Sequence, residues 1–557
     1  MIGLLARRTL TDRPRRTLLL LGGFGLSVGV MIVLLSIGQA VLEQARDKDV
    51  IGGGDVIVLP EGVDIEVMKV GGATGMFFSI DNARFVYRQV LSGPRFAGWI
   101  ESLPGLATTA APGPAPAASP PLAAASPELA NEVVYVRRPA GGSAPRRALA
   151  HGVLPSLQRV VNGGPVSPEG APIDWTDTHA DRMWIDPPVD SLYNDMDRFH
   201  RPPPGTRDLD RWAEWLYFNF SDPESGAHGF LSFIVGGDPT TGAARGYPLL
   251  QLVRPGEPPA RFAGDLALGP DGFSTERVDL RFGDGTRARF ESGAWRLALD
   301  WQSAAGRVRG ALDVVPVPDL YYPPFWIHSS ADFASGYAVP ALGATIDGWI
   351  EAGGRRLELQ RAPGYHDHNW GTWRNVHWDW GTAASPQYGL FYGRVEHPEL
   401  QPGRAGAGIF LMLLQARQGN RRGGFLALFR PDSIAYSWRV APSSLPGQPA
   451  RVPEEIRLTA ALDPYGLERG AGGDTARGGH ANPDRIDVRI RVQDVLSNPP
   501  GEREAGRVFL QLRGSYGVSA VVTGRELAFA APGFAEVFVP SRVPGTSSAD
   551  GSSDRGP

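Results

Sequence analysis

The chain has 557 residues, of which 42% are hydrophobic and 20% charged, and its 55 basic and 59 acidic residues give a net charge of −4. These values exclude a wholly disordered chain and a polytopic membrane protein, and the near balance of charge predicts no bulk attraction to nucleic acid. Cysteine is absent, which excludes a disulfide scaffold, a cysteine-ligated metal centre and a thiol nucleophile.

The first predicted element is a membrane-spanning helix over residues 17–42, which contain no charged side chain. As a helix this stretch is about 39 Å long, more than the ~30 Å thickness of the hydrocarbon core. Several arginines precede it, so the positive-inside rule places the N-terminus in the cytoplasm and the remainder in the periplasm. A signal peptide cleaved near Gly38–Ala40 is the alternative, but the apolar stretch is longer than a signal peptide needs. We expect a single-pass anchor in a bacterial inner membrane, formed by residues 1–43.

The residues around this helix resemble the start of ABC-transporter permeases of the FtsX/MacB type. The matching stretches are Arg7–Leu10, Arg16–Leu19, Gly54–Pro60 and Phe77–Phe85. The resemblance implies that residues 44–103 form a small extracytoplasmic α/β segment and that an ABC transporter permease and its ATPase are possible partners. Such permeases have further spans that this chain lacks, so we do not expect a complete permease.

A linker and a large β domain follow. Residues 104–130 are rich in Ala, Pro and Ser and predict an extended spacer, whereas the polar residues 541–557 predict a disordered tail. Between them lies a domain of residues 131–540, in which apolar residues from about Leu154 to Val539 mostly recur at every second position and Gly- or Pro-containing turns separate the runs. This pattern predicts antiparallel sheets with one face toward a core. Roughly fifteen strands are too many for one small barrel, so two barrels or two sandwiches in tandem are expected, with barrels preferred.

Glu214 belongs to the first of two aromatic motifs, WAEWLYFNF at residues 212–220. As a strand, this motif directs Glu214 to one face and Trp215 and Tyr217 to the other. A carboxylate on an otherwise apolar face needs a partner or a function. We therefore treat Glu214 as a candidate catalytic residue, with a salt-bridged structural glutamate as an equally good alternative.

The second motif is GYHDHNWG at residues 364–371, in a region rich in histidine and tryptophan. As a strand, it directs Tyr365, Asp367 and Asn369 to one face and His366, His368 and Trp370 to the other. Such a cluster is the strongest functional signal in the chain.

Three interpretations of this second motif remain open. His366 and His368 could ligate zinc with a third ligand such as His377. Alternatively, Asp367 exchanges a proton with a bound molecule, because a carboxyl group in an apolar, aromatic pocket has a raised pKa. The third is a structural cluster in which buried Trp packing and His–Asp hydrogen bonds lock two strands. We favour proton exchange over metal binding.

Together the motifs resemble the signature stretches of the carotenoid 1,2-hydratase (CrtC) superfamily, which includes AttH-type secreted proteins and lipocalin-like cyclases. The Tyr-x-Asp-x-Asn-Trp-Gly pattern of residues 365–371 carries most of the resemblance, which extends over about residues 165–540. It implies a mainly β fold of two tandem lipocalin-like antiparallel β-barrels and an acid–base site at Tyr365 and Asp367. The hydratases protonate a terminal isoprenoid alkene and let water capture the cation, so neither a redox cofactor nor a metal is implied.

The sequence therefore predicts a membrane-anchored periplasmic protein that binds a hydrophobic, isoprenoid or lipid-like molecule and acts on it by acid–base chemistry. The alternative is a non-catalytic accessory or carrier subunit of an ABC-type lipoprotein or lipid export system. No cofactor and no nucleic-acid partner are expected. The candidate catalytic residues are Asp367, Tyr365 and Glu214, and the candidate ligand-binding residues are Tyr217, Trp215, His366, His368, Asn369 and Trp370.

Overall fold

The computed structural model describes residues 84–85, 88, 128–136, 146–153, 177–202, 209–237, 244–269, 272–283, 285–329, 334–372, 376–396, 408–441, 448–462, 484–498, 507–522 and 524–541. The predicted anchor at residues 17–42 lies outside these ranges, as do most of the permease-like segment and of the linker, and nearly all of the predicted tail. Within the described ranges, no helix combines the length and the apolar character needed to cross a bilayer.

The chain divides into two compact units, the first of which comprises Met1–Ser79 and Ala123–Asp181. The described part of this unit contains an antiparallel strand pair, β1 (Glu128–Val136) and β2 (Arg146–Val153). β1 begins within the range predicted to be linker, so β structure starts before residue 131.

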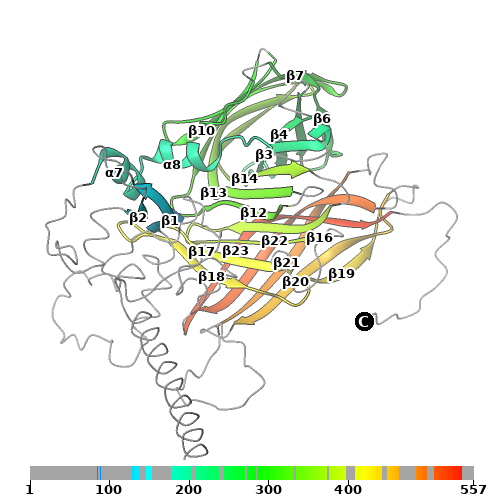
Figure 1. Cartoon of the computed structure of the whole chain (residues 1–557). Coiled ribbons are helices and arrows are strands. Elements are labelled where there is room, and N and C mark those ends of the chain that lie inside the picture. Colours follow the sequence, from blue (N-terminus) through cyan, green and yellow to red (C-terminus); the bar gives the residue numbers. More distant parts are fainter. Residues whose placement is uncertain are drawn as a thin grey trace, which may run out of the picture. The chain divides into compact units, whose positions relative to one another are not determined.

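The second unit, Ile80–Leu122 and Arg182–Pro557, contains two antiparallel sheets, which confirms the predicted mainly β class (Figure 1). Before the first sheet the chain forms the helices α7 (His179–Ile185) and α8 (Val189–Met196) and the 3-10 helix η2 (Leu209–Arg211).

The first sheet has 12 strands in the order β6-β5-β4-β3-β14-β13-β11-β10-β9-β8, with β12 paired to β13 and β7 paired to β5. Its strands are β3 (Trp212–Ser221), β4 (His228–Gly236), β5 (Arg245–Val253), β6 (Ala260–Ala263), β7 (Leu266–Ala267), β8 (Asp279–Phe282), β9 (Thr286–Glu291), β10 (Ala294–Ser303), β11 (Gly306–Pro316), β12 (Tyr322–Ser329), β13 (Ala334–Ala352) and β14 (Arg355–Thr372).

The second sheet has nine strands in the order β18-β17-β16-β15-β23-β22-β21-β20-β19. These are β15 (His377–Ala384), β16 (Tyr388–Glu396), β17 (Phe410–Gln415), β18 (Gly424–Phe429), β19 (Ala435–Val440), β20 (Arg451–Leu462), β21 (Asp484–Asn498), β22 (Arg507–Val522) and β23 (Arg525–Pro540).

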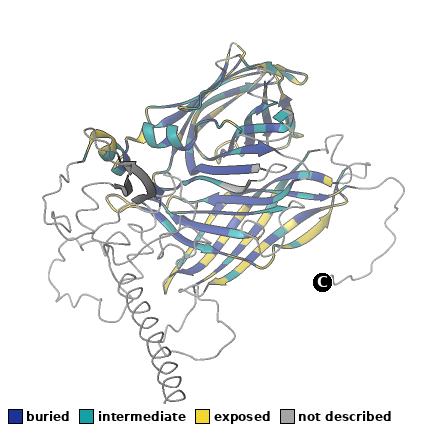
Figure 2. Cartoon of the chain, viewed as in Figure 1, coloured by how far each residue is buried: buried dark blue, intermediate teal, exposed yellow. Residues whose placement is uncertain are grey.

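Each sheet buries one apolar face, as its period-two sequence predicts. In β10, for example, Leu297, Leu299 and Trp301 are buried, whereas the residues between them are partly or fully exposed. These side chains belong to a core inside the first sheet, and residues such as Leu411 and Val488 form a corresponding core inside the second. Burial of one such side chain stabilises the fold by about 1.5–3 kcal/mol. Figure 2 shows the buried residues along the strands of both sheets.

A third apolar cluster lies between the two sheets. It unites Tyr217, Phe230 and Tyr365 of the first sheet with Trp380 and Phe534 of the second. The central strand β3 and residues 365–372 of β14 are therefore covered on both faces, which explains why nearly every residue of β3 is buried. A functional group on either face of these stretches is shielded from water.

Candidate functional site

The two aromatic motifs lie side by side on β3 and β14. In their antiparallel register Asp367 lies opposite Tyr217, and Trp370 lies opposite Glu214. Because opposite partners share a face and faces alternate along a strand, the predicted site residues separate into two groups. The faces expected from the sequence are confirmed: the odd-numbered residues of 365–369 face the second sheet, and the even-numbered ones face the first core.

The group between the two sheets is here called the tyrosine group. It consists of Asp367, Tyr217, Tyr337 and Tyr365 of the first sheet and Trp380 of the second. Oδ2 of Asp367 accepts hydrogen bonds from the hydroxyls of Tyr365 (2.9 Å) and Tyr337 (3.2 Å). These two hydroxyls are 2.9 Å apart, and Nε1 of Trp380 donates to the Tyr337 hydroxyl over 2.8 Å. Asp367 itself is only 4% exposed. A carboxyl group is thus enclosed by aromatic rings from both sheets.

The surroundings of Asp367 favour its protonated form. Burial raises the pKa of this carboxyl well above its ordinary value, and the charge of Glu536 raises it further. Hydrogen bonds from Tyr365 and Tyr337 oppose this rise without reversing it. The pKa values of the two phenols are also raised well above the ordinary tyrosine value, mainly by burial. These shifts favour the protonated carboxyl group and the neutral phenols.

Tyr217 connects this group with a second acid, Glu536 of β23. Its hydroxyl has no hydrogen-bond partner among the described residues, and its pKa is raised well above normal by burial and by the charge of Glu536. Glu536 accepts hydrogen bonds from Nε1 of Trp378 (2.9 Å) and Nε2 of Gln511 (3.0 Å). A buried hydroxyl without a partner is costly, so this is a place where a water or a polar atom of a ligand would be stabilised.

The remaining predicted ligand contacts on this face are Trp215 and Asn369. Asn369 donates a hydrogen bond from Nδ2 to Oδ1 of Asp367 over 3.2 Å and so orients the carboxyl group. Trp215 is partly buried and packs against the inter-sheet cluster. Both side chains are near Asp367, but Asn369 contacts the acid itself.

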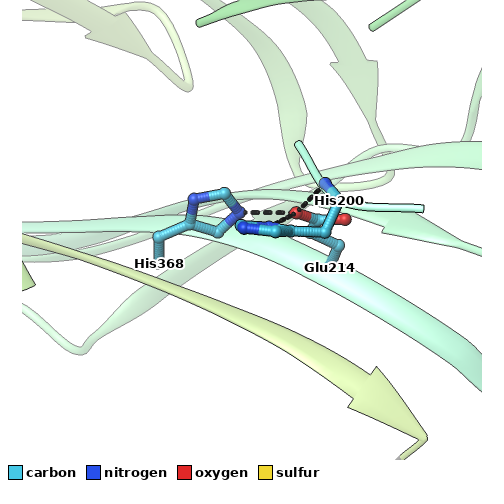
Figure 3. A group of neighbouring side chains, drawn as sticks. All are labelled: His200, Glu214 and His368. Atoms are coloured by element: carbon cyan, nitrogen blue, oxygen red, sulfur yellow. Dashed lines mark hydrogen bonds and ion pairs between the residues drawn. The ribbon is translucent and has the colours of Figure 1, made fainter. Parts of the chain in front are cut away.

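The opposite face carries a second group, formed by Asp197, His200, Glu214, His366 and His368 and here called the histidine group. Figure 3 shows three of its members, His200, Glu214 and His368. His368 lies between two carboxylates, with Nδ1 3.0 Å from Oδ1 of Asp197 and Nε2 2.9 Å from Oε1 of Glu214. The same Glu214 oxygen lies 3.0 Å from Nδ1 of His200. His366 places Nε2 2.9 Å from Oδ2 of Asp197. Four of the five side chains are almost completely buried.

The histidine group balances its own charges. Burial raises the pKa of Asp197, but His366 and His368 outweigh this effect and lower it to about 2. The pKa of Glu214 is likewise lowered, because hydrogen bonds from His200 and His368 outweigh burial. Burial lowers the pKa of His368, yet hydrogen bonds to both carboxylates raise it to about 9. In this state His368 is an imidazolium between two carboxylates.

The three candidate catalytic residues do not lie together. Asp367 and Tyr365 lie between the sheets, on the face opposite the first core. Glu214 belongs to the histidine group on the other face. Trp370 also lies there, where its indole stacks on His200 with ring centroids 3.8 Å apart.

Sequence reasoning missed several members of both groups, namely Tyr337, Trp380, Glu536, Asp197 and His200. Tyr337 lies in an apolar segment whose strand character is visible in the sequence. Its pairing with the second motif, opposite Asn369, is visible only in the structure. Asp197 and His200 had no signal in the sequence: they lie after α8 in an irregular segment with no recognisable motif.

Comparisons with known proteins add a likeness at the level of structure. No family model matches the sequence, and no curated protein matches it significantly. The chain is similar to the crystal structure of a protein from Nitrosomonas europaea that is provisionally named AttH (14% identity, 61% of this chain, 97% of that chain, TM-score 0.37). It is also similar to CghA (14% identity, 62% and 97%, TM-score 0.39) and to kievitone hydratase from Nectria haematococca (10% identity, 61% and 94%, TM-score 0.35). Because these TM-scores are low, the likeness assigns neither a family nor a substrate.

Proposed function

We propose that the chain binds a hydrophobic, isoprenoid or lipid-like molecule beside the tyrosine group and adds water to one of its double bonds. The observation that carries this proposal is the hydrogen-bonded set of Asp367, Tyr365 and Tyr337, enclosed between two sheets by aromatic side chains. An alkene needs a proton donor in an apolar setting, and this set provides both.

The proposed reaction uses only groups of this site and water. The carboxyl proton of Asp367 is transferred to one alkene carbon, which leaves a tertiary cation on the neighbouring carbon. The faces of Trp380 and Tyr217 stabilise that cation. A water molecule held near the Tyr217 hydroxyl and Glu536 then bonds to the cationic carbon and returns one proton to the Asp367 carboxylate. The sum is one alkene and one water converted to one tertiary alcohol.

An Asp367→Asn variant tests this function on the detergent-solubilised full chain. Squalene serves as the probe, because its ends are terminal isoprenoid alkenes, and mass spectrometry detects a gain of one water. We expect turnover by the wild type and a roughly 10²–10⁴-fold loss in the variant, since the amide cannot donate the same proton. The affinity for squalene, measured by tryptophan fluorescence, should be nearly the same in the variant and the wild type.

Asp313→Asn is the matched control, because Asp313 is a half-exposed carboxylate on β11 of the same sheet that pairs with Arg296. It should keep full turnover. Binding of squalene without any hydrated product in the wild type would instead favour the carrier function. Absence of both binding and turnover would contradict both functions.

We further propose that residues 17–42 anchor the protein in the inner membrane, with the β sheets in the periplasm beside an ABC transporter. The support is the uncharged length of this stretch and the permease-like residues that flank it. The full chain should sediment with inner membranes, and protease added to spheroplasts should digest its β domain. Deletion of residues 1–43 should abolish membrane association, whereas protection from the protease would contradict the proposed orientation.

We also propose that the first sheet curves into a lipocalin-like barrel. The support is a contact between strands distant in the sheet order: Phe262 of β6 and Trp301 of β10 pack in the same core. Nε1 of Trp301 also donates a hydrogen bond to the Phe262 carbonyl oxygen over 3.4 Å. A strongly curved sheet brings such strands together, whereas a flat sheet does not.

A further inference from the structure

The histidine group contains a set of atoms that is arranged like the ligands of a metal ion. Nδ1 of His200, one carboxylate oxygen of Glu214 and Nε2 of His368 all lie within 4.8 Å of one another (Figure 3). Two imidazole nitrogens and one carboxylate oxygen are the protein ligands of many zinc sites that keep one position open. The three residues come from the segment after α8, from β3 and from β14, so the fold itself brings them together.

The distances require little rearrangement to accommodate an ion. Oε1 of Glu214 is 2.9 Å from Nε2 of His368 and 3.0 Å from Nδ1 of His200. Zinc bonds of about 2.0–2.1 Å at tetrahedral angles would separate neighbouring ligand atoms by about 3.3 Å. These two separations need to widen by only a few tenths of an ångström, and the two histidine nitrogens lie within 4.8 Å of each other.

The residues around these ligands orient them as metal-binding histidines are usually oriented. Oδ1 of Asp197 accepts a hydrogen bond from Nδ1 of His368 and thereby turns Nε2 toward Glu214. Nε1 of Trp295 donates to Asp197 over 2.7 Å and fixes this carboxylate in turn. A carboxylate on the far nitrogen of a ligating histidine is the common second layer of zinc sites.

Access and charge also suit a bound cation. The side chain of His368 is fully buried, whereas that of His200 is 22% exposed, so one of the three ligands is partly accessible to solvent. With neutral imidazoles, the carboxylates of Glu214 and Asp197 together balance the two charges of a divalent ion. No other charged partner is needed.

We propose that His200, Glu214 and His368 bind one zinc ion, with Asp197 as a positioning residue. The ligand set differs from the one that the His-x-His pattern suggests. His366 is engaged by Asp197 and by the Tyr217 carbonyl oxygen, and His377 lies on β15 of the second sheet. The site lies on the face opposite Asp367 and does not depend on the proposed hydration. It ties the segment after α8 to the two central strands.

The test uses the untagged full chain, treated with a chelator and then titrated with Zn²⁺. We expect one equivalent of bound zinc by elemental analysis and a rise in Tm upon binding. His200→Ala removes the partly exposed ligand and should lower zinc affinity at least 10-fold, and Asp197→Asn should lower it about 10–100-fold. Co²⁺ bound in place of zinc should give the visible absorption of a four-coordinate site in the wild type, and this absorption should be lost in His200→Ala.

His377→Ala is the matched control and should keep the stoichiometry, the affinity and the Tm shift of the wild type. A wild-type chain that takes up no zinc would overturn the proposal and leave a purely proton-linked cluster. Zinc that binds His200→Ala as tightly as the wild type would likewise overturn it, because the ion would then be bound elsewhere. Circular dichroism of His200→Ala confirms that any loss is not due to unfolding.

Discussion

Replacing Asp197 by asparagine is expected to lower the free energy of unfolding by about 3–5 kcal/mol. Its carboxylate accepts hydrogen bonds from His366, His368 and the Trp295 indole, all in the buried interior. Asparagine has nearly the same shape as aspartate but carries no charge. Its amino group replaces one of the two carboxylate oxygens and would face hydrogen-bond donors, to which it cannot bond as an acceptor. Buried donors that lose their acceptor are costly, and those on cationic rings are the most costly. Chemical denaturation followed by tryptophan fluorescence measures the change.

Asp195→Asn is the control for this effect. Asp195 lies two residues away, and its half-exposed carboxylate is 3.7 Å from Arg84. Because this carboxylate is half-exposed and its contact with Arg84 is long, it should contribute no more than about 1 kcal/mol, and the variant should be nearly as stable as the wild type. Equal stability of the two variants would show that the interior does not depend on the Asp197 charge.

Replacing Gly336 by alanine is expected to destabilise the fold by about 1–3 kcal/mol. Gly336 lies on β13 directly opposite Trp370 of β14, and a Cβ atom at this position would overlap the indole ring. The indole is fully buried and stacked on His200, so it cannot move aside without disturbing the histidine group. Thermal unfolding of the variant measures the cost.

Gly517→Ala on β22 is the matched control, because the nearest atom to its added Cβ would be 3.9 Å away, at ordinary contact distance. It should leave the Tm nearly unchanged. A Gly336→Ala variant as stable as this control would mean that the Trp370 indole can be displaced at little cost.

The strand character of both motifs could be predicted from sequence because alternation is a local property. Tyr365 and Asp367 were expected on one face and His366 and His368 on the other, and the structure confirms this division. The period of two shows which residues share a face, but not which of the two faces a second sheet covers. The position of Asp367 between the two sheets could therefore not be predicted.

The composition of each group could not be predicted, because it depends on pairing between distant segments. β3 and β14 are separated by ten strands in sequence but are neighbours in the sheet. Asp197 was indistinguishable in sequence from Asp195, although one is fully buried and the other half-exposed. Glu536 lies more than 150 residues from Asp367 and influences it only because the second sheet packs against the first.

The alternation along β14 has a consequence for how this protein tolerates change. A single-residue deletion between Gly364 and Trp370 would invert the strand beyond the deletion, moving each carboxyl or imidazole group to the wrong side. Point substitutions on one side can leave the other side intact, whereas length changes cannot. Homologous chains should therefore keep the spacing of residues 364–370 even where individual side chains differ.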